Sequence, residues 1–205
     1  VGSEMCIRDR VVYLGVYDTF ADGDTRSNAS VQMFNRVDVW VQTIQKESTA
    51  YAKEKKAHDI ICEYVEYEEG TYDQTAYSAV MQKKTVCAGY AKLYSMLTNA
   101  AGLETVSVTS ATHGWNRTKL GNQWYNVDLT WDDGTPISYQ FFNKSDATME
   151  KYDGSSRESH TQNHYYDGVA PGCESDYGAS VTVVDAEQIL SLIHISEPTR
   201  LLSIS

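Results

Sequence analysis

The stretch Val86-Cys87-Ala88-Gly89-Tyr90-Ala91 places a cysteine where a helical pattern of apolar residues begins. This pattern continues as far as Gly102, which is a typical stop signal after a helix. The apolar face comprises Ala91, Tyr94, Leu97 and Ala101. The sequence therefore predicts a helix from Cys87 to about Ala101, with a thiol in its first turn.

A thiol in this position has two interpretations. It lies beside backbone N–H groups that lack partners within the helix, at the positive end of the helix dipole, and both features favour a thiolate. Ala88 and Gly89 add little bulk, so a carbonyl group could approach the sulfur and use the same N–H groups as oxyanion donors. A buried structural cysteine explains the helix pattern equally well.

A predicted hairpin downstream carries a histidine and an aspartate. Its strands are expected at residues 113–119 and 123–129, joined by a turn at Leu120-Gly121-Asn122. A two-residue turn makes His113 and Asp128 diagonal neighbours on one face, and a four-residue turn places them directly opposite. A three-residue turn would separate them onto opposite faces.

In two of these three registers the carboxylate of Asp128 can orient the imidazole of His113. A neutral His113 could then take the thiol proton of Cys87 and later protonate a leaving amine, while Asp128 fixes its tautomer. An ordinary cross-strand polar pair is the alternative interpretation.

The residues that carry this chemistry belong to a longer series of motifs. The series comprises Tyr72-Asp73, Ala76-Tyr77-Ser78-Ala79-Val80, Val86-Cys87-Ala88-Gly89-Tyr90-Ala91, His113-Gly114-Trp115-Asn116 and Trp124-Tyr125-Asn126-Val127-Asp128-Leu129-Thr130-Trp131-Asp132-Asp133. In this order they resemble the bacterial transglutaminase-like superfamily. The resemblance runs from Ala57-His58-Asp59 to Tyr139-Gln140-Phe141-Phe142-Asn143.

This resemblance implies a papain-like α+β fold, in which a nucleophile-bearing helix packs on an antiparallel sheet that carries the histidine and the aspartate. It implies Cys87 as nucleophile, His113 as general base and acid, and Asp128 as the orienting carboxylate. Residues expected to bind substrate or to form walls of the site are Tyr90, Trp115, Asn116 and Trp131, each with core packing as the alternative.

Three positions depart from the family pattern. Gly114 stands where alanine is expected, Ser78 where glycine is usual, and Gln82-Lys83-Lys84 where the family has glutamate and glycine. None of these departures removes a catalytic atom.

The motifs predict a cysteine-dependent acyl-transfer enzyme that acts on peptide or glutamine amide bonds through a thioester. Water as acceptor would make it a cysteine protease, and an amine would make it a transglutaminase-like acyltransferase. The expected partners are a protein or peptide substrate and an amine acceptor. Neither a cofactor nor a metal is expected, because the sequence offers no calcium cage and no zinc-binding cysteine pairs. The alternative is a non-catalytic module with the same fold that binds peptide or cell wall.

The two ends of the chain look foreign to the protein. Residues 1–10 and 190–199 can be encoded by opposite strands of one DNA segment, as expected for a translated sequencing adapter. We therefore expect residues 1–10 and 190–205 to be adapter-derived. Residues 11–47 would be an N-terminal helical region, truncated at its start, and residues 48–189 a transglutaminase-like domain.

The composition restricts the class of protein. The net charge is −11 and the pI is about 4.8, which disfavours nucleic acid as a partner. No apolar run of membrane length is present. The acidic charge, the many tyrosines and the free thiols fit a bacterial protein at the cell surface or outside the cell. After Cys6 is set aside with the adapter, Cys62, Cys87 and Cys173 do not suggest a disulfide framework.

Periodicity predicts two further helices, at residues 31–45 and 51–65, with Ser48 or Thr49 as the cap of the second. In the second helix Cys62 is expected to pack, residues 53–56 to face solvent, and His58 to be partly buried or to have a functional role. Residues 22–28 are expected to form a polar loop that weakly resembles a calcium loop, with Arg26 at a ligand position.

The remaining segments are expected to be strands, loops and one short helix. Strands are predicted at residues 11–17, 103–111, 137–143 and 180–184, a helix from residue 145, and loops at residues 64–79 and 151–176. The loop at residues 64–79 is expected to form the rim of a binding site.

Overall fold

A computed structural model describes residues 17–153, 160–163 and 170–178. The adapter-derived ends predicted at residues 1–10 and 190–205, and the strand predicted at residues 180–184, lie outside the described residues. The same is true of the strand predicted at residues 11–17, except for residue 17. Among the described residues, no helix is both long and apolar enough to cross a membrane.

The first long helix, α1, runs from Gly23 to Ile44, after a short 3₁₀ turn, η1, at Asp18–Phe20. It begins at Gly23 rather than at residue 31, so the loop predicted at residues 22–28 is wrong. The reason is local, because the Asp22 carboxylate accepts a hydrogen bond from the backbone N–H of Thr25 at 2.7 Å and caps the helix. This first part of α1 is exposed and lacks an apolar stripe, so periodicity does not detect it.

The second helix, α2 (Ala50–Tyr64), begins where the cap predicts, since the Thr49 side chain accepts a hydrogen bond from the N–H of Ala52 at 3.1 Å. One expectation about its surface is wrong, because Glu54 is fully buried. Its carboxyl group accepts hydrogen bonds from the Asn143 side chain at 2.7 Å and from the Tyr94 hydroxyl at 3.2 Å. These partners lie far away in the sequence, and they allow a carboxyl group to face the core.

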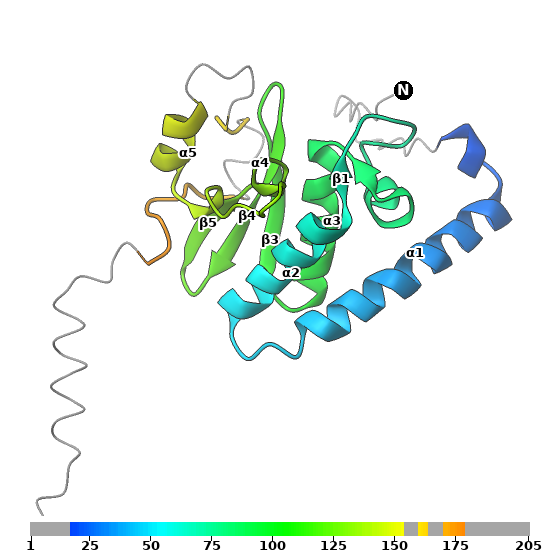
Figure 1. The fold of residues 1–205 in the computed structure, drawn as a ribbon, viewed down its shortest axis with the longest axis horizontal. Coiled ribbons are helices and arrows are strands. Elements are labelled where there is room, and N and C mark those ends of the chain that lie inside the picture. Colours follow the sequence, from blue (N-terminus) through cyan, green and yellow to red (C-terminus); the bar gives the residue numbers. More distant parts are fainter. Residues whose placement is uncertain (1–16, 154–159, 164–169, 179–205) are drawn as a thin grey trace, which may run out of the picture.

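The helix that begins at Cys87, α3 (Cys87–Ala100), ends near Gly102 as predicted, with φ of +90° at this glycine. It packs between α2 and the main sheet (Figure 1). The core around it comprises residues from all three long helices and the sheet: Val37, Val41, Ile44, Ala57, Ile61, Tyr90, Leu93, Tyr94, Leu97, Val127 and Phe142. The burial of this apolar surface fixes the position of the helix that carries the thiol.

The main sheet is antiparallel, with the strand order β3-β4-β5-β6. Its strands are β3 (Glu104–Thr109), β4 (Gly114–Leu120), β5 (Gln123–Val127) and β6 (Phe142–Lys144). Leu120 pairs with Gln123 and Asn116 with Val127, which confirms the two-residue turn. The strand predicted at residues 137–143 is shorter than expected, since β6 begins only at Phe142.

Short elements replace parts of the predicted loops. Strands β1 (Glu66–Tyr67) and β2 (Lys84–Thr85) form a small parallel sheet, and a short π-helix, η2, covers Ser78–Gln82. A one-turn helix, α4 (Leu129–Asp132), follows β5, and α5 (Asp146–Asp153) forms the short helix predicted from residue 145.

The main sheet is covered on both faces. Adjacent residues of β4 point to opposite faces, so Asn116 bonds to α3 while Arg117 bonds to Asp146 at the start of α5. In Figure 1, α5 and α3 accordingly lie on opposite sides of the sheet. A second, smaller core fills the α5 side with Val108, Trp115, Phe141, Met149 and Ala170. The α+β fold, with a helix packed on an antiparallel sheet, is confirmed.

Candidate active site

The thiol of Cys87 lies in the first turn of α3 and is half-buried. The residue before it, Val86, supplies no side-chain cap, and its carbonyl accepts hydrogen bonds from the N–H groups of Gly89 and Tyr90. The preceding N–H groups, of Cys87 and Ala88, belong to the part of a helix that has no intrahelical acceptor. The start of α3 therefore combines a nucleophile with potential oxyanion donors.

A tight turn before β4 positions His113. The Ser110 hydroxyl accepts the N–H of His113 at 3.2 Å, and the N–H of Ser110 donates to the carbonyl of His113 at 2.9 Å. The ring of His113 is buried, with 3% of the residue exposed. The hydrogen bond to Asp128 and the interaction with the Cys87 thiol outweigh the effect of burial and raise the pKa of His113 to about 10. The imidazolium form is thereby favoured at neutral pH.

The carboxylate of Asp128 both caps helix α4 and contacts His113. Its Oδ1 atom accepts the N–H of Thr130 at 2.9 Å and caps α4, while its Oδ2 atom lies 2.5 Å from Nε2 of His113. The carboxylate is buried, yet hydrogen bonds from His113 and His160 hold its pKa well below the usual range. Two of the three turn lengths considered from the sequence make His113 and Asp128 neighbours, and the observed two-residue turn brings them into contact.

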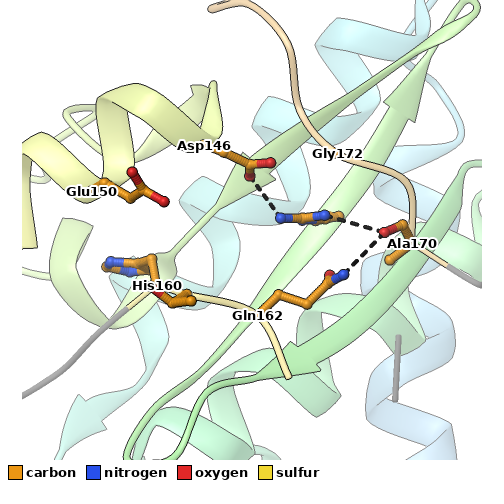
Figure 2. A pocket seen from close by; sticks show the side chains of 8 residues that line it. Asp146, Glu150, His160, Gln162, Ala170 and Gly172 are labelled. Carbon is orange, nitrogen blue, oxygen red and sulfur yellow. Dashed lines mark hydrogen bonds and ion pairs between the residues drawn. The ribbon is translucent and has the colours of Figure 1, made fainter. Parts of the chain in front are cut away.

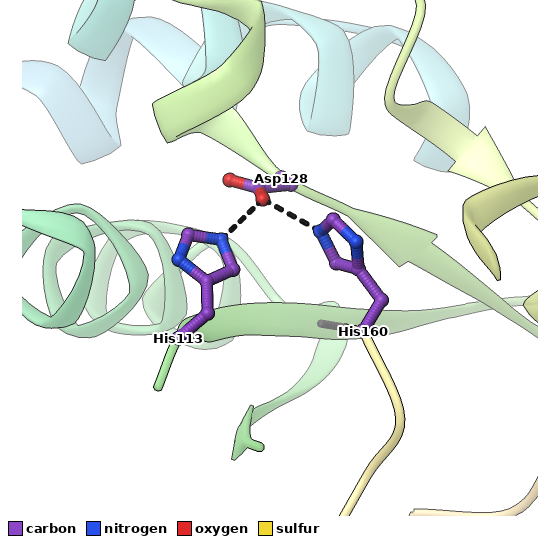
Figure 3. A group of neighbouring side chains, drawn as sticks. All are labelled: His113, Asp128 and His160. Atoms are coloured by element: carbon purple, nitrogen blue, oxygen red, sulfur yellow. Dashed lines mark hydrogen bonds and ion pairs between the residues drawn. The ribbon is translucent and has the colours of Figure 1, made fainter. Parts of the chain in front are cut away.

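A third titratable side chain joins this pair, and the sequence analysis did not predict it. Nε2 of His160 lies 2.9 Å from the same Oδ2 atom of Asp128, as Figure 3 shows. His160 belongs to a stretch predicted only as loop, with no periodicity and no motif.

The spacing of this cluster matches hydrogen bonds better than metal coordination. The ligand atoms of His113, Asp128 and His160 all lie within 4.8 Å of one another. Ligands of a tetrahedral zinc ion, each 2.0–2.2 Å from the metal, are roughly 3.3 Å apart. The 2.5 Å contact between Nε2 of His113 and Oδ2 of Asp128 is too short for two ligands of one zinc ion, and it indicates a short hydrogen bond between these two groups.

Two of the four residues expected at the wall of the site lie beside the cluster. The ring of Trp115 stacks on His113 with centroids 6.2 Å apart, and Trp131 lies 6.0 Å from the same ring. Trp115 is buried and donates from its indole nitrogen to the side-chain oxygen of Asn126 at 2.9 Å. Trp131 is only partly buried, so it can contact a substrate.

The other two residues have internal partners. Tyr90 is 1% exposed, donates to the carbonyl of Val65 at 3.2 Å and contacts the carboxylate of Asp133. Asn116 is also 1% exposed, and its amide donates to the Ala91 carbonyl of α3 at 3.0 Å. The structure thus places Tyr90 and Asn116 in the packing that supports the site rather than at a surface open to substrate.

The remaining histidine and cysteine residues of the sequence analysis are buried in other places. His58 lies between two carboxylates, 3.3 Å from each of Asp59 and Asp132. Cys62 packs 3.9 Å from the same ring, and burial raises its pKa. Burial also raises the pKa of Cys173 to about 12. These thiols are poor candidates for a nucleophile.

Two departures from the family pattern fit their surroundings. A β carbon at Gly114 would meet its nearest neighbour, in Thr109, at 3.7 Å, so alanine fits there as well as glycine. The buried hydroxyl of Ser78 lies within hydrogen-bond distance of the Thr75 carbonyl, at 2.9 Å, and of the Thr85 hydroxyl, at 3.0 Å. Neither residue disturbs the cluster.

A polar cleft of about 470 Å³ opens beside His160, on the α5 side of the sheet (Figure 2). It is lined by Arg117, Asp146, Glu150, His160, Thr161, Gln162, Ala170 and Gly172. Arg117 is fixed there by Asp146 at 2.6 Å and by the carbonyl of Ala170 at 3.1 Å. The cleft therefore gives His160 a polar outer face.

Comparisons with known proteins agree with this fold. A family model described as the transglutaminase-like superfamily matches residues 38–129. No curated protein matches the chain.

Two solved structures resemble the fold. One is described as a "TGase", with 15% identity and a TM-score of 0.43 over 56% of this chain and 35% of that one. The other, a "Putative Cysteine Protease from Cytophaga hutchinsonii", has 20% identity and a TM-score of 0.41 over 53% of this chain and 43% of that one. This chain thus spans less than half the length of either structure, and these likenesses carry no information on its activity. Residues 38–129, which match the model of the transglutaminase-like superfamily, include Cys87, His113 and Asp128.

Proposed function

We propose that this protein is a cysteine-dependent acyl-transfer enzyme that acts on peptide or glutamine amide bonds through a thioester at Cys87. The observation that supports this most is the 2.5 Å contact in which Asp128 orients His113. The thiol of Cys87 is the other group that raises the pKa of this imidazole. A thiol, an imidazole and a carboxylate in this order match the roles of nucleophile, base and orienting group.

The acylation half of the reaction uses both nitrogens of His113. Nε2 is engaged by Asp128, which leaves Nδ1 to take the thiol proton of Cys87. The thiolate attacks the amide carbon and forms a C–S bond, while N–H groups at the start of α3 stabilise the oxyanion. His113 then gives its proton to the leaving nitrogen as the C–N bond breaks, which produces a thioester and a free amine.

The deacylation half depends on the acceptor. Water or a primary amine gives a proton to His113 and attacks the thioester carbon, and the C–S bond breaks to restore the thiol. Water releases an acid, so the enzyme acts as a protease, whereas an amine forms a new amide, so the enzyme acts as a transglutaminase.

Incubation with a peptide library and a labelled primary amine distinguishes these outcomes by mass spectrometry. We expect cleaved or amine-bearing peptides with the wild type and none with Cys87→Ala. Cys62→Ala is the matched control, because this buried thiol lies outside the cluster, and it should retain the product. Product formation by Cys87→Ala would contradict the proposal, and a wild type that modifies no peptide would favour the non-catalytic binding module.

A further inference from the structure

The Oδ2 atom of Asp128 accepts two imidazole hydrogen bonds rather than one. Nε2 of His113 lies at 2.5 Å and Nε2 of His160 at 2.9 Å, and the two rings meet edge to face with centroids 5.3 Å apart. Figure 3 shows both rings directed at this oxygen. Asp128 is 1% exposed, so each donor matters for keeping the carboxylate charged.

The outer side of His160 is held by a second carboxylate. Nδ1 of His160 contacts Oδ1 of Asp153, and the backbone N–H of His160 donates to the other oxygen of Asp153 at 2.9 Å. Asp153 is the last residue of α5. Since a carboxylate only accepts hydrogen bonds, His160 binds both carboxylates when each of its ring nitrogens carries a proton.

Hydrogen bonds join the segment that contains His160 to the turn that contains His113. Asn163 donates from its side chain to the Thr109 hydroxyl and to the Ser110 carbonyl, both at 3.0 Å. The His160 ring packs edge to face on Trp115 and Trp131, with centroids 5.1 and 4.9 Å away. His160 is 4% exposed, so these packing contacts and hydrogen bonds hold its ring against Asp128.

We propose that His160 is a positioning residue of the acyl-transfer site, which aims the Asp128 carboxylate at His113 and weakens the hold of that carboxylate on the His113 proton. The inference rests on the proposed function, since it assigns a role within that reaction. A carboxylate oxygen that already accepts a hydrogen bond from His160 attracts the proton on Nε2 of His113 less strongly. His113 then passes its other proton, on Nδ1, more readily to a leaving amine.

The charged groups around both rings come from several elements. Asp128, before α4, and Cys87, on α3, face His113. Asp128 and Asp153 face His160, and Glu150 lines the same cleft. Asp146 and Arg117 also line this cleft but bind each other at 2.6 Å.

The rate at which iodoacetate alkylates Cys87 reports whether His113 is protonated. This anionic reagent is attracted by the imidazolium, so its rate falls when His113 loses its proton at alkaline pH. The rate at Cys87 would be followed by peptide mapping after brief pH jumps. His160→Phe keeps an aromatic ring among the tryptophans but removes both donors, whereas His160→Gln keeps an N–H directed at Asp128.

In a plot of the alkylation rate against pH, the alkaline limb is the fall in rate that occurs as His113 loses its proton. We expect His160→Phe to move this limb to higher pH by about one unit, which corresponds to the free energy of one hydrogen bond to a charged group. His160→Gln should return the limb toward the wild-type position, and the exposed Thr161→Ala, in the same segment, should leave it unchanged. Asp153→Asn should shift the limb in the same direction as His160→Phe, and it provides a second test if His160→Phe does not fold. An unchanged limb in His160→Phe and Asp153→Asn, or equal shifts in the Phe and Gln variants, would overturn the inference.

Failure of the proposed function has a different signature. In that case His113→Ala would not change the alkylation of Cys87, and the wild type would show no alkaline limb, which would overturn both proposals. If His113→Ala removes the limb while the His160 variants leave it in place, only the role of His160 is wrong.

Discussion

Asn116 donates a hydrogen bond from its side-chain amide to the carbonyl of Ala91 at 3.0 Å, and this bond joins β4, which directly follows His113, to the helix of Cys87. Ala91 lies one helical turn after Cys87, and Asn116 lies three residues after His113. The same amide donates to the Ser95 hydroxyl at 2.8 Å. These buried bonds fix the position of the imidazole relative to the thiol.

Asn116→Ala should therefore lower both stability and the reactivity of Cys87. Because the Ala91 carbonyl would lose a buried donor, we expect a loss of about 1–3 kcal/mol in the free energy of unfolding. Urea denaturation measures this loss, and alkylation of the folded variant measures reactivity. The control is Asn28→Ala, on the exposed part of α1, which should stay within about 0.5 kcal/mol. Equal effects of the two substitutions would contradict the role of Asn116.

Two glycines near the site should respond differently to alanine. A β carbon at Gly89 would lie 1.7 Å from Oγ1 of Thr85, whereas one at Gly114 would have no neighbour closer than 3.7 Å. Gly89→Ala must move β2 or α3, so we expect a loss of about 1–3 kcal/mol or failure to fold. Gly114→Ala should remain within about 1 kcal/mol of the wild type. Thermal denaturation of both variants tests this, and a tolerated Gly89→Ala would show that the close approach is absent.

The helix of Cys87 and the hairpin of His113 and Asp128 could be predicted because their signals are local. Gly102 marks the end of the helix, and Leu120-Gly121-Asn122 marks the turn of the hairpin, although three turn lengths were open until the structure showed a two-residue turn. Long-range contacts explain what the sequence did not show. His160 reaches the site through contacts with Asp128 and Asp153, and no local pattern encodes such a contact.

The burial of Glu54 predicts a pH-dependent stability. Burial in the core raises its pKa to about 7, against hydrogen bonds from Asn143 and Tyr94 that lower it. The neutral acid is favoured in the folded state, so this contribution is fully present below pH 4.5 and is lost as the pH rises through about 7. The total loss is roughly 3 kcal/mol.

Glu54→Gln keeps the shape of the side chain without its charge. We expect it to be more stable than the wild type at pH 8 and to have a flatter stability profile between pH 4.5 and pH 7. Urea denaturation across this range measures the difference. Glu63→Gln, on the exposed side of the same helix, is the matched control and should follow the wild type. A parallel profile for Glu54→Gln would mean that Glu54 does not titrate in the folded protein.

Asp128 should control the alkaline limit of the reactive pair. Its hydrogen bond helps to raise the pKa of His113 to about 10, so alkylation of Cys87 by iodoacetate should persist well above neutral pH in the wild type. In Asp128→Asn we expect the alkaline limb to move down toward the ordinary imidazole value of about 6.5. The rate at Cys87 as a function of pH measures the shift, and an alkaline limb near pH 10 in this variant would show that Asp128 does not hold the proton.

The most direct test of the account is the rate of Cys87 alkylation at pH 7, in the wild type and in His113→Ala, compared with free cysteine. Peptide mapping separates Cys87 from the buried Cys62 and Cys173. Because the imidazole of His113 and the thiol of Cys87 interact, and this interaction raises the pKa of His113, Cys87 of the wild type should react at least about tenfold faster than free cysteine, and His113→Ala should remove this advantage. A wild-type rate no faster than that of free cysteine, unchanged in His113→Ala, would contradict the assignment of Cys87 as an activated nucleophile.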